Sequence, residues 1–180
     1  MLSNIGTTLV VFTLFISFFI INASFVDLKN TNKLVSKKLY KFSLLQSTFI
    51  IVAFFTLITS FVVSDFSVIN VFQNSHSTKP LFYKIVGTWG NHEGSLLLWI
   101  NILVIFSYLF LLYNKNSKKN YRLYTLVIQN LLIIVFLVFL LINSNPFSPI
   151  YPVPVEGLGL NPILQDPALA VHPPLLYIGF

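Results

Sequence analysis

Four long apolar runs constrain this sequence more than any other feature. They cover about 5–25, 42–63, 94–113 and 123–142. A helix needs roughly 20 apolar residues to cross the hydrocarbon core of a bilayer. Backbone N–H and C=O groups find no water at that depth, so a lipid-exposed run must form a helix. The sequence therefore predicts an all-α polytopic membrane protein, with residues 1–180 as a single membrane domain.

The first run resembles a secretory signal peptide only in its position. It has no basic residues before it and no small-residue cleavage site after it, so we interpret it as a mature span. Only 9% of the residues are charged and the mean hydropathy is +0.82, against about 25% charged residues in soluble domains. The absence of cysteine excludes disulfides and thiolate metal sites.

The basic residues fall on one side of the predicted spans. Nine of the eleven lie in two short loops, at Lys29, Lys33, Lys37, Lys38, Lys41, Lys115, Lys118, Lys119 and Arg122. Loops rich in Lys and Arg stay on the cytoplasmic or matrix side. The net charge of +6 therefore has a topological explanation, and we expect no nucleic-acid partner. The N-terminus and two long loops, 64–93 and 143–171, are expected on the outer face.

The second outer loop leads to a histidine followed by two prolines. Proline is well tolerated in the first turn of a helix, so a fifth helix is expected to begin at about Pro173 and Pro174, with His172 at its cap. The helix dipole would favour the neutral imidazole there, which is the form that ligates metal. Asp166 could hydrogen-bond the second ring nitrogen and fix the tautomer. The alternative is a polar helix cap at the membrane surface.

The segment Trp89-Gly-Asn-His-Glu-Gly-Ser-Leu-Leu-Leu-Trp99 opens the third span. Glu93 lies where the helix should begin, and an anion is favoured at a helix N-terminus. Trp89 and Trp99 are typical of an interfacial belt or of the lip of a pocket, and His92 is a candidate pocket residue. The alternative is that the whole segment is an ordinary helix start, with a capping residue and with tryptophans at the membrane interface.

Two long motifs resemble one family. Trp89–Trp99 is similar to the "WGxHEGSLLLW" signature of the CcmF/NrfE family, whose members are haem lyase subunits of cytochrome c maturation. Leu160-Asn-Pro-Ile-Leu-Gln-Asp-Pro-Ala-Leu-Ala-Val-His-Pro-Pro-Leu-Leu-Tyr177 resembles that family's "LNPLLQDPxLxxHPPLLYxGY". The resemblance extends in order over essentially the whole sequence, and both motifs are specific.

This resemblance implies haem as the cofactor. It assigns His172 as one of two outer-face axial ligands of the haem iron. It makes Trp89, Trp99 and Asp166 candidate haem-pocket residues. His92, Glu93, Pro173 and Pro174 become pocket or helix-entry residues.

The family continues past these motifs with a tryptophan-rich segment, a second outer-face histidine and two transmembrane histidines, none of which occurs here. We therefore expect the N-terminal subunit or fragment of a haem lyase, which attaches haem to the CxxCH thiols of apocytochrome c and is not active alone. The implied partners are the chains that carry the remaining segments, a haem-delivery chaperone, apocytochrome c and membrane lipid.

An excess of Phe, Ile, Leu, Asn and Lys over Ala and Gly is typical of an AT-rich gene, so we expect the mitochondrial inner membrane, with a bacterial inner membrane as the alternative. Two other functions stay open. A structural subunit of a respiratory or transport complex would need only the spans. A haem or solute exporter would need a polar path, and the spans offer few polar residues.

Overall fold

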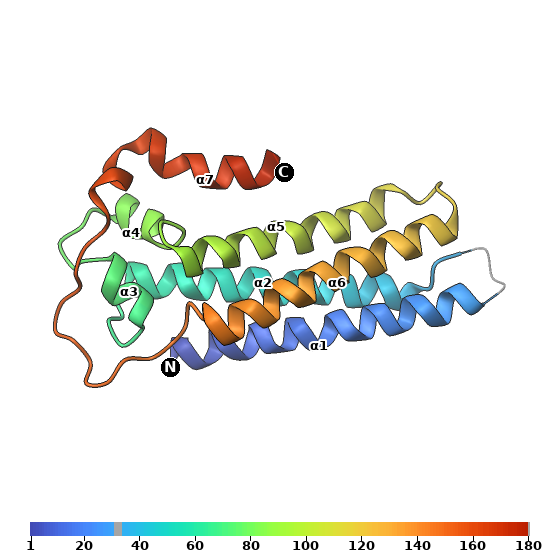
Figure 1. Cartoon of the computed structure of the whole chain (residues 1–180), viewed down its shortest axis with the longest axis horizontal. Helices are drawn as coiled ribbons and strands as arrows, with labels where there is room; N and C mark the ends of the chain where they lie inside the picture. The colour runs from blue at the N-terminus through green and yellow to red at the C-terminus, as the bar shows by residue number, and fades with distance from the viewer. Residues whose placement is uncertain (31–33, 180) are drawn as a thin grey trace.

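Four long helices form the body of the protein in the computed structural model, which describes residues 1–30 and 34–179. They are α1 (Leu2–Lys29), α2 (Lys37–Val62), α5 (His92–Tyr113) and α6 (Lys119–Asn143). The helices run lengthwise as a bundle, in which α1 packs on α2 and α6, and α5 packs on the same two helices (Figure 1). Each is long and apolar enough to cross a membrane. The prediction of an all-α polytopic membrane protein is confirmed.

Each helix is longer than the apolar run that predicted it. The extra turns are polar and lie at the ends of the bundle, where water can solvate charged side chains. Arg122, in the first turn of α6, is 4% exposed and donates to the hydroxyl of Tyr40 at 2.6 Å and to the Leu111 carbonyl at 2.8 Å. This guanidinium therefore joins α2, α5 and α6 at the end that holds the two short basic loops. Lys33, a basic residue of the first of these loops, lies outside the described residues.

The interior of the bundle contains polar side chains, whereas its surface is apolar. Gln46 in α2 is 1% exposed and donates to Ser17 Oγ of α1 at 2.7 Å and to Asn130 Oδ1 of α6 at 3.0 Å. Large apolar residues such as Phe15 and Phe55 are more than half exposed on the outside. Lipid is as apolar as leucine, so helix association in a membrane depends on close packing and on such interhelical hydrogen bonds.

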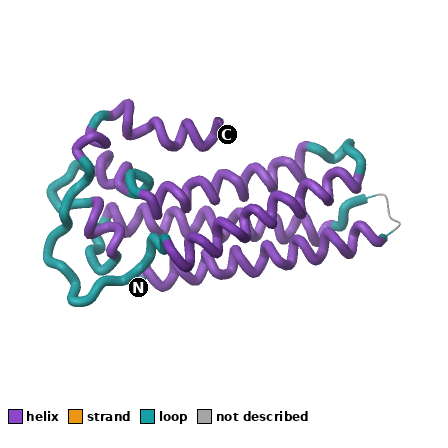
Figure 2. The backbone as a smooth tube through the Cα atoms, in the orientation of Figure 1, coloured by secondary structure: helices purple, strands orange, loops and turns teal. Residues whose placement is uncertain are grey.

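The long loops gather at the opposite end of the bundle from the basic loops (Figure 2). The first contains two short helices, α3 (Ile69–Asn74) and α4 (Leu81–Gly87). A single antiparallel bridge joins Val68 of this loop to Pro149 of the second loop, and the described residues form no β-strand. The second loop also covers the start of α1, where Ser3 Oγ donates to the Phe147 carbonyl at 2.6 Å.

A carboxylate fastens the tip of the first loop to the second. Glu156 accepts hydrogen bonds from the Ser77 hydroxyl, from the Ser77 N–H at 2.9 Å and from the Gly157 N–H at 3.0 Å. These donors lower the pKa of Glu156 to about 2, and His76 lies 3.8 Å from its carboxylate. Backbone bonds from Leu158 N–H to the Phe72 carbonyl and from Gly159 N–H to the Ser75 carbonyl extend the same contact.

The last helix, α7 (Pro167–Gly179), follows a short 3-10 turn, η1 (Pro162–Gln165). It runs beside α5 and in the same direction, from the end with the long loops toward the middle of the bundle (Figure 1). The expected start at about residue 173 is wrong, because the helix begins six residues earlier, at Pro167. The stretch expected as the outer loop 143–171 therefore includes η1 and the first turn of α7.

Candidate functional site

Asp166 and Pro167 start the helix that carries the candidate histidine. Asp166 Oδ1 accepts from the N–H of Ala168 at 2.8 Å and of Leu169 at 3.1 Å, as an N-cap residue does. Pro167 occupies the first helical position, where a missing N–H costs nothing. The expected hydrogen bond from Asp166 to the His172 imidazole is absent from the described residues, because this carboxylate caps the helix instead.

His172 is the sixth residue of α7, in the interior of the helix, and Pro173 and Pro174 follow it inside the helix. The predicted cap position is therefore wrong. A helix dipole acts mainly within the first turn, so the argument for a neutral imidazole from that dipole does not apply here.

The imidazole lies on an exposed apolar face of α7. Residues three and four apart share one face of a helix. Leu169, Leu175 and Leu176 flank His172 at these spacings and are 48%, 64% and 45% exposed. Ala170, in contrast, belongs to a buried cluster with Val86 of α4 and is fully buried. His172 therefore presents an accessible imidazole within an apolar patch.

The segment before α5 holds the buried side of α7. The Tyr83 hydroxyl donates to the Gln165 carbonyl at 2.8 Å. The Trp89 indole Nε1 donates to the Ala170 carbonyl at 2.9 Å, two residues before His172. The structure therefore brings the tryptophan of one motif next to the histidine-bearing helix of the other.

Trp99 contacts α7 one turn after the histidine. Its ring stacks at 6.3 Å on Tyr177 and lies 4.5 Å from the ring of Phe136 in α6. A cavity of ≈ 560 Å³ opens between α7 and the bundle at this level. Its lining is mostly apolar, with one amide, and consists of Trp99, Ile102, Leu103, Phe106, Gln129, Tyr177, Ile178 and Gly179.

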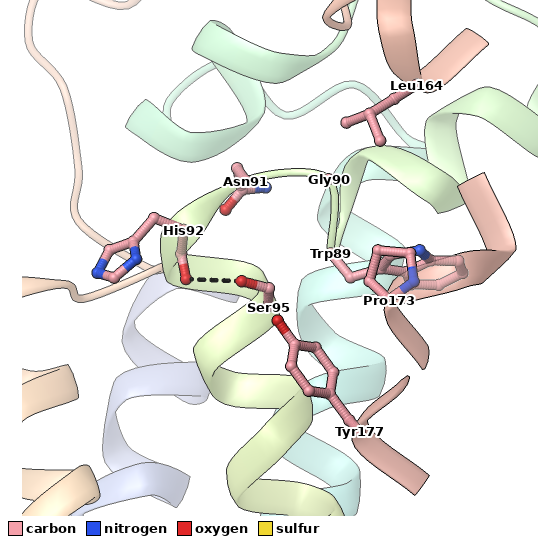
Figure 3. Close-up of a pocket in the computed structure, with 8 residues that line it drawn as sticks. All are labelled: Trp89, Gly90, Asn91, His92, Ser95, Leu164, Pro173 and Tyr177. Carbon is pink, nitrogen blue, oxygen red and sulfur yellow. Dashed lines mark hydrogen bonds between the residues drawn. The ribbon is translucent and has the colours of Figure 1, made fainter. Parts of the chain in front are cut away.

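A second cavity, of ≈ 290 Å³, lies between the entry to α5 and the inner side of α7 (Figure 3). Its lining comes from both motifs and consists of Trp89, Gly90, Asn91, His92, Ser95, Leu164, Pro173 and Tyr177. Pro173 and Tyr177 face it from α7. Asn91 closes its rim as the N-cap of α5, where its side chain accepts from the Gly94 N–H at 2.7 Å.

The imidazole of His92 points away from this cavity (Figure 3). Its Nε2 lies 3.1 Å from Ser144 Oγ at the end of α6, and its ring meets Phe139 edge-on. The neighbouring Glu93 lines a separate polar cavity of ≈ 140 Å³ with residues of α3 and α6. His92 and Glu93 are thus helix-entry residues on the side of α5 away from α7.

Comparison with known proteins gives a family match that includes both of these motifs. The family model described as cytochrome C assembly protein matches residues 89–180, slightly more than half of the chain. The chain belongs to this family. No solved structure matches the chain.

The relatives are cytochrome c-type biogenesis proteins. CycK of Rhizobium meliloti is 52% identical over 134 residues, which cover 73% of this chain and 20% of CycK. CcmF of Escherichia coli is 43% identical over 129 residues, 71% of this chain and 20% of CcmF. NrfE of Haemophilus influenzae is 43% identical over 121 residues, which cover 67% of this chain and 19% of NrfE. The chain spans about a fifth of the length of these relatives.

The residues of α7 fit one axial side of a haem. Haem iron is commonly held by an imidazole, and the porphyrin face needs apolar contact. His172 offers that nitrogen, and the leucines around it offer the apolar surface. Among residues 1–30 and 34–179, no three His, Asp or Glu side chains come together as a metal site.

Sequence reasoning missed Tyr83 and Tyr177 as residues that fix and line the site. Tyr177 lies at the end of the second motif and Tyr83 lies before the first, and neither has a charge or a spacing that indicates its partner. The Asp166-Pro167 pair was the missed signal for the start of α7, since an N-cap acid before proline at the first position marks a helix N-terminus.

Proposed function

We propose that the chain is the N-terminal part of the membrane haem lyase of cytochrome c maturation, with His172 as one axial ligand of the haem iron. The observation that carries this proposal is an accessible imidazole in the exposed apolar face of α7, on a helix that the Trp89 motif holds in place. Membership of the cytochrome c assembly family supports the same function.

The residues of this chain would bind and orient the group. His172 supplies a nitrogen to the iron, and Leu169, Leu175 and Leu176 cover part of the ring face. Haem, when bound, supplies the vinyl groups that react with the cysteine thiols of apocytochrome c. Trp99 and Tyr177 form an aromatic wall below this site.

Further chains would complete the machinery. The chain spans about a fifth of the length of its relatives, and we propose that a second axial ligand and a tryptophan-rich surface from other segments of the haem lyase complete the haem site. A haem-delivery chaperone and apocytochrome c would be the other partners. We expect no haem attachment by this chain alone.

We propose an inner membrane of bacterial type, since the relatives reported above are bacterial. They give no support to the mitochondrial placement expected from composition. The basic end of the bundle would face the cytoplasm, because Lys- and Arg-rich loops are retained there. The long loops and the start of α7 would then face the outer side.

The test is purification of the tagged chain from its native membrane, followed by a haem spectrum and mass identification of the proteins that come with it. We expect haem and tryptophan-rich partner chains to co-purify. His172→Ala should lose the haem, and added imidazole should restore part of the spectrum. His76→Ala is the matched control, a histidine of the same end of the bundle that contacts only loop residues.

Retention of haem in His172→Ala would show that this histidine is not the ligand. Co-purification with respiratory subunits and without haem would favour the alternative of a structural subunit.

A further inference from the structure

Two adjacent prolines inside α7 leave two of its carbonyls without their usual helical partners. In an α-helix each N–H donates to the carbonyl four residues earlier. Proline has no N–H. Pro173 therefore cannot donate to the Leu169 carbonyl, and Pro174 cannot donate to the Ala170 carbonyl.

The Trp89 indole takes over one of these two bonds. Its Nε1 lies 2.9 Å from the Ala170 carbonyl oxygen, the acceptor that Pro174 leaves free. Ala170 is fully buried, so water cannot reach this residue readily, and a buried carbonyl without a donor is unfavourable. The indole N–H is a donor only, so it matches a lone acceptor. The Trp89 motif and the His-Pro-Pro motif thus meet in one hydrogen bond.

We propose that Trp89 is a positioning residue for His172, and that its effect depends on Pro174. The indole holds α7 at a point two residues before the imidazole and so fixes that imidazole relative to the outer end of α5. This inference rests on the proposed function of His172. In this proposal Trp89 acts on the imidazole through the backbone of α7.

The surroundings of Trp89 are rigid enough for such a role. Val86, Leu160 and Ala170 form a small buried cluster, against which Tyr83, Trp89 and Leu164 pack. A Cβ at Gly90 would lie 2.8 Å from Leu164 Cδ1, so the backbone after Trp89 lies close against η1. A tether from a rigid support restricts the helix that it holds.

Pro174 separates this role from that of an ordinary interfacial tryptophan. A tryptophan that only anchors the chain at the membrane interface would make the same contribution to haem retention and to the stability of α7 whichever residue occupies position 174. In a Pro174→Ala chain, the restored N–H can donate to the Ala170 carbonyl, and the indole bond becomes redundant. The proposal therefore predicts that substitutions at positions 89 and 174 are coupled.

The experiment uses the full chain in its native membrane assembly and compares Trp89→Phe, Pro174→Ala and the double variant. The readouts are the haem retained per chain, the axial-ligand spectrum and hydrogen exchange of α7 amides in haem-free membranes. Trp89→Phe keeps an aromatic ring and loses only the donor. Loss of an outer partner of a metal ligand weakens binding by about 10–100-fold, and we expect about tenfold here because Trp89 acts through the backbone.

Trp89→Phe should also speed exchange in α7 and leave exchange in α1 and α2 unchanged, which shows that the bundle is folded. The double variant should recover most of the haem lost in Trp89→Phe. Equal haem loss in Trp89→Phe and the double variant would overturn the proposed coupling between positions 89 and 174. Unchanged haem content and unchanged exchange in Trp89→Phe would overturn the proposal that the indole holds α7 in place.

The control is Tyr83→Phe, which removes a donor to the Gln165 carbonyl, a group that precedes α7 and is not freed by a proline. Its effect should be independent of position 174. If His172→Ala retains haem while Trp89→Phe still loosens α7 in a Pro174-dependent way, the proposed function fails and the tether stands without a haem role.

Discussion

Gln46→Leu tests how far the buried amide network holds the bundle together. Gln46 donates to Ser17 of α1 at 2.7 Å and to Asn130 of α6 at 3.0 Å, and it is 1% exposed. Interhelical hydrogen bonds in membrane proteins contribute ~0.6 kcal/mol on average and up to ~1.7 kcal/mol. Leucine removes two of them and leaves Asn130 Oδ1 without a donor. We expect a loss of about 1–2 kcal/mol, a factor of ~5–30 in the unfolding equilibrium.

The assay is reversible unfolding in mixed micelles, followed by helix content, with Thr48→Val as the control. Thr48 is exposed and its hydroxyl donates only to the Leu44 carbonyl of its own helix, so its replacement should change little. Gln46→Leu combined with Asn130→Leu should be less destabilised than the sum of the single variants, because an apolar pair leaves no buried group unpaired. Equal midpoints for Gln46→Leu and Thr48→Val would show that the Gln46 hydrogen bonds do not stabilise the bundle.

Two further predictions concern the outer end of the bundle. A side chain at Gly6 would overlap the ring of Phe147, so Gly6→Ala should cost about 1–3 kcal/mol in the same assay, and Phe147→Ala should relieve most of the added loss. Glu156 has its pKa lowered from 4.5 to about 2, so its contribution to loop docking is complete above 4.5 and is lost as pH falls toward 2. The protection factors of the Leu158 and Gly159 amides, which are exchange rates corrected for the pH dependence of an unprotected amide, should therefore fall over that range. Glu156→Gln should make these protection factors independent of pH, and an unchanged pH profile in this variant would contradict the assignment.

The bundle could be predicted from the sequence because each long helix is specified by its own apolar run. The boundaries were less predictable, since polar turns such as the one around Arg122 extend a helix without adding to its apolar run. The start of α7 was misplaced because two helix-start signals compete within eight residues, Asp166-Pro167 and Pro173-Pro174. The structure uses the first, where a side chain caps the helix, and tolerates the second inside it.

The candidate site was predictable as a set of residues but not as an arrangement. His172 and Trp89 each stand out locally, one before two prolines and the other at a span entry. Their connection joins residues 81 positions apart through a backbone carbonyl, and a backbone acceptor has no sequence signature. His92 shows the same limit, since its partner Ser144 lies 52 residues later.

The contact between Ser3 and Phe147 has a consequence for the order of assembly during synthesis. The two residues are 144 positions apart, so the start of α1 stays uncovered until the segment after α6 has been translated and has reached the same end of the bundle. The packing of α1, the first helix to be synthesised, is therefore completed only after the loop that contains Phe147 has been synthesised. Contacts between residues so far apart in sequence form slowly during folding. In ribosome-bound chains that end before residue 147, a thiol introduced by Ser3→Cys should therefore react with a thiol reagent, and longer chains should protect it.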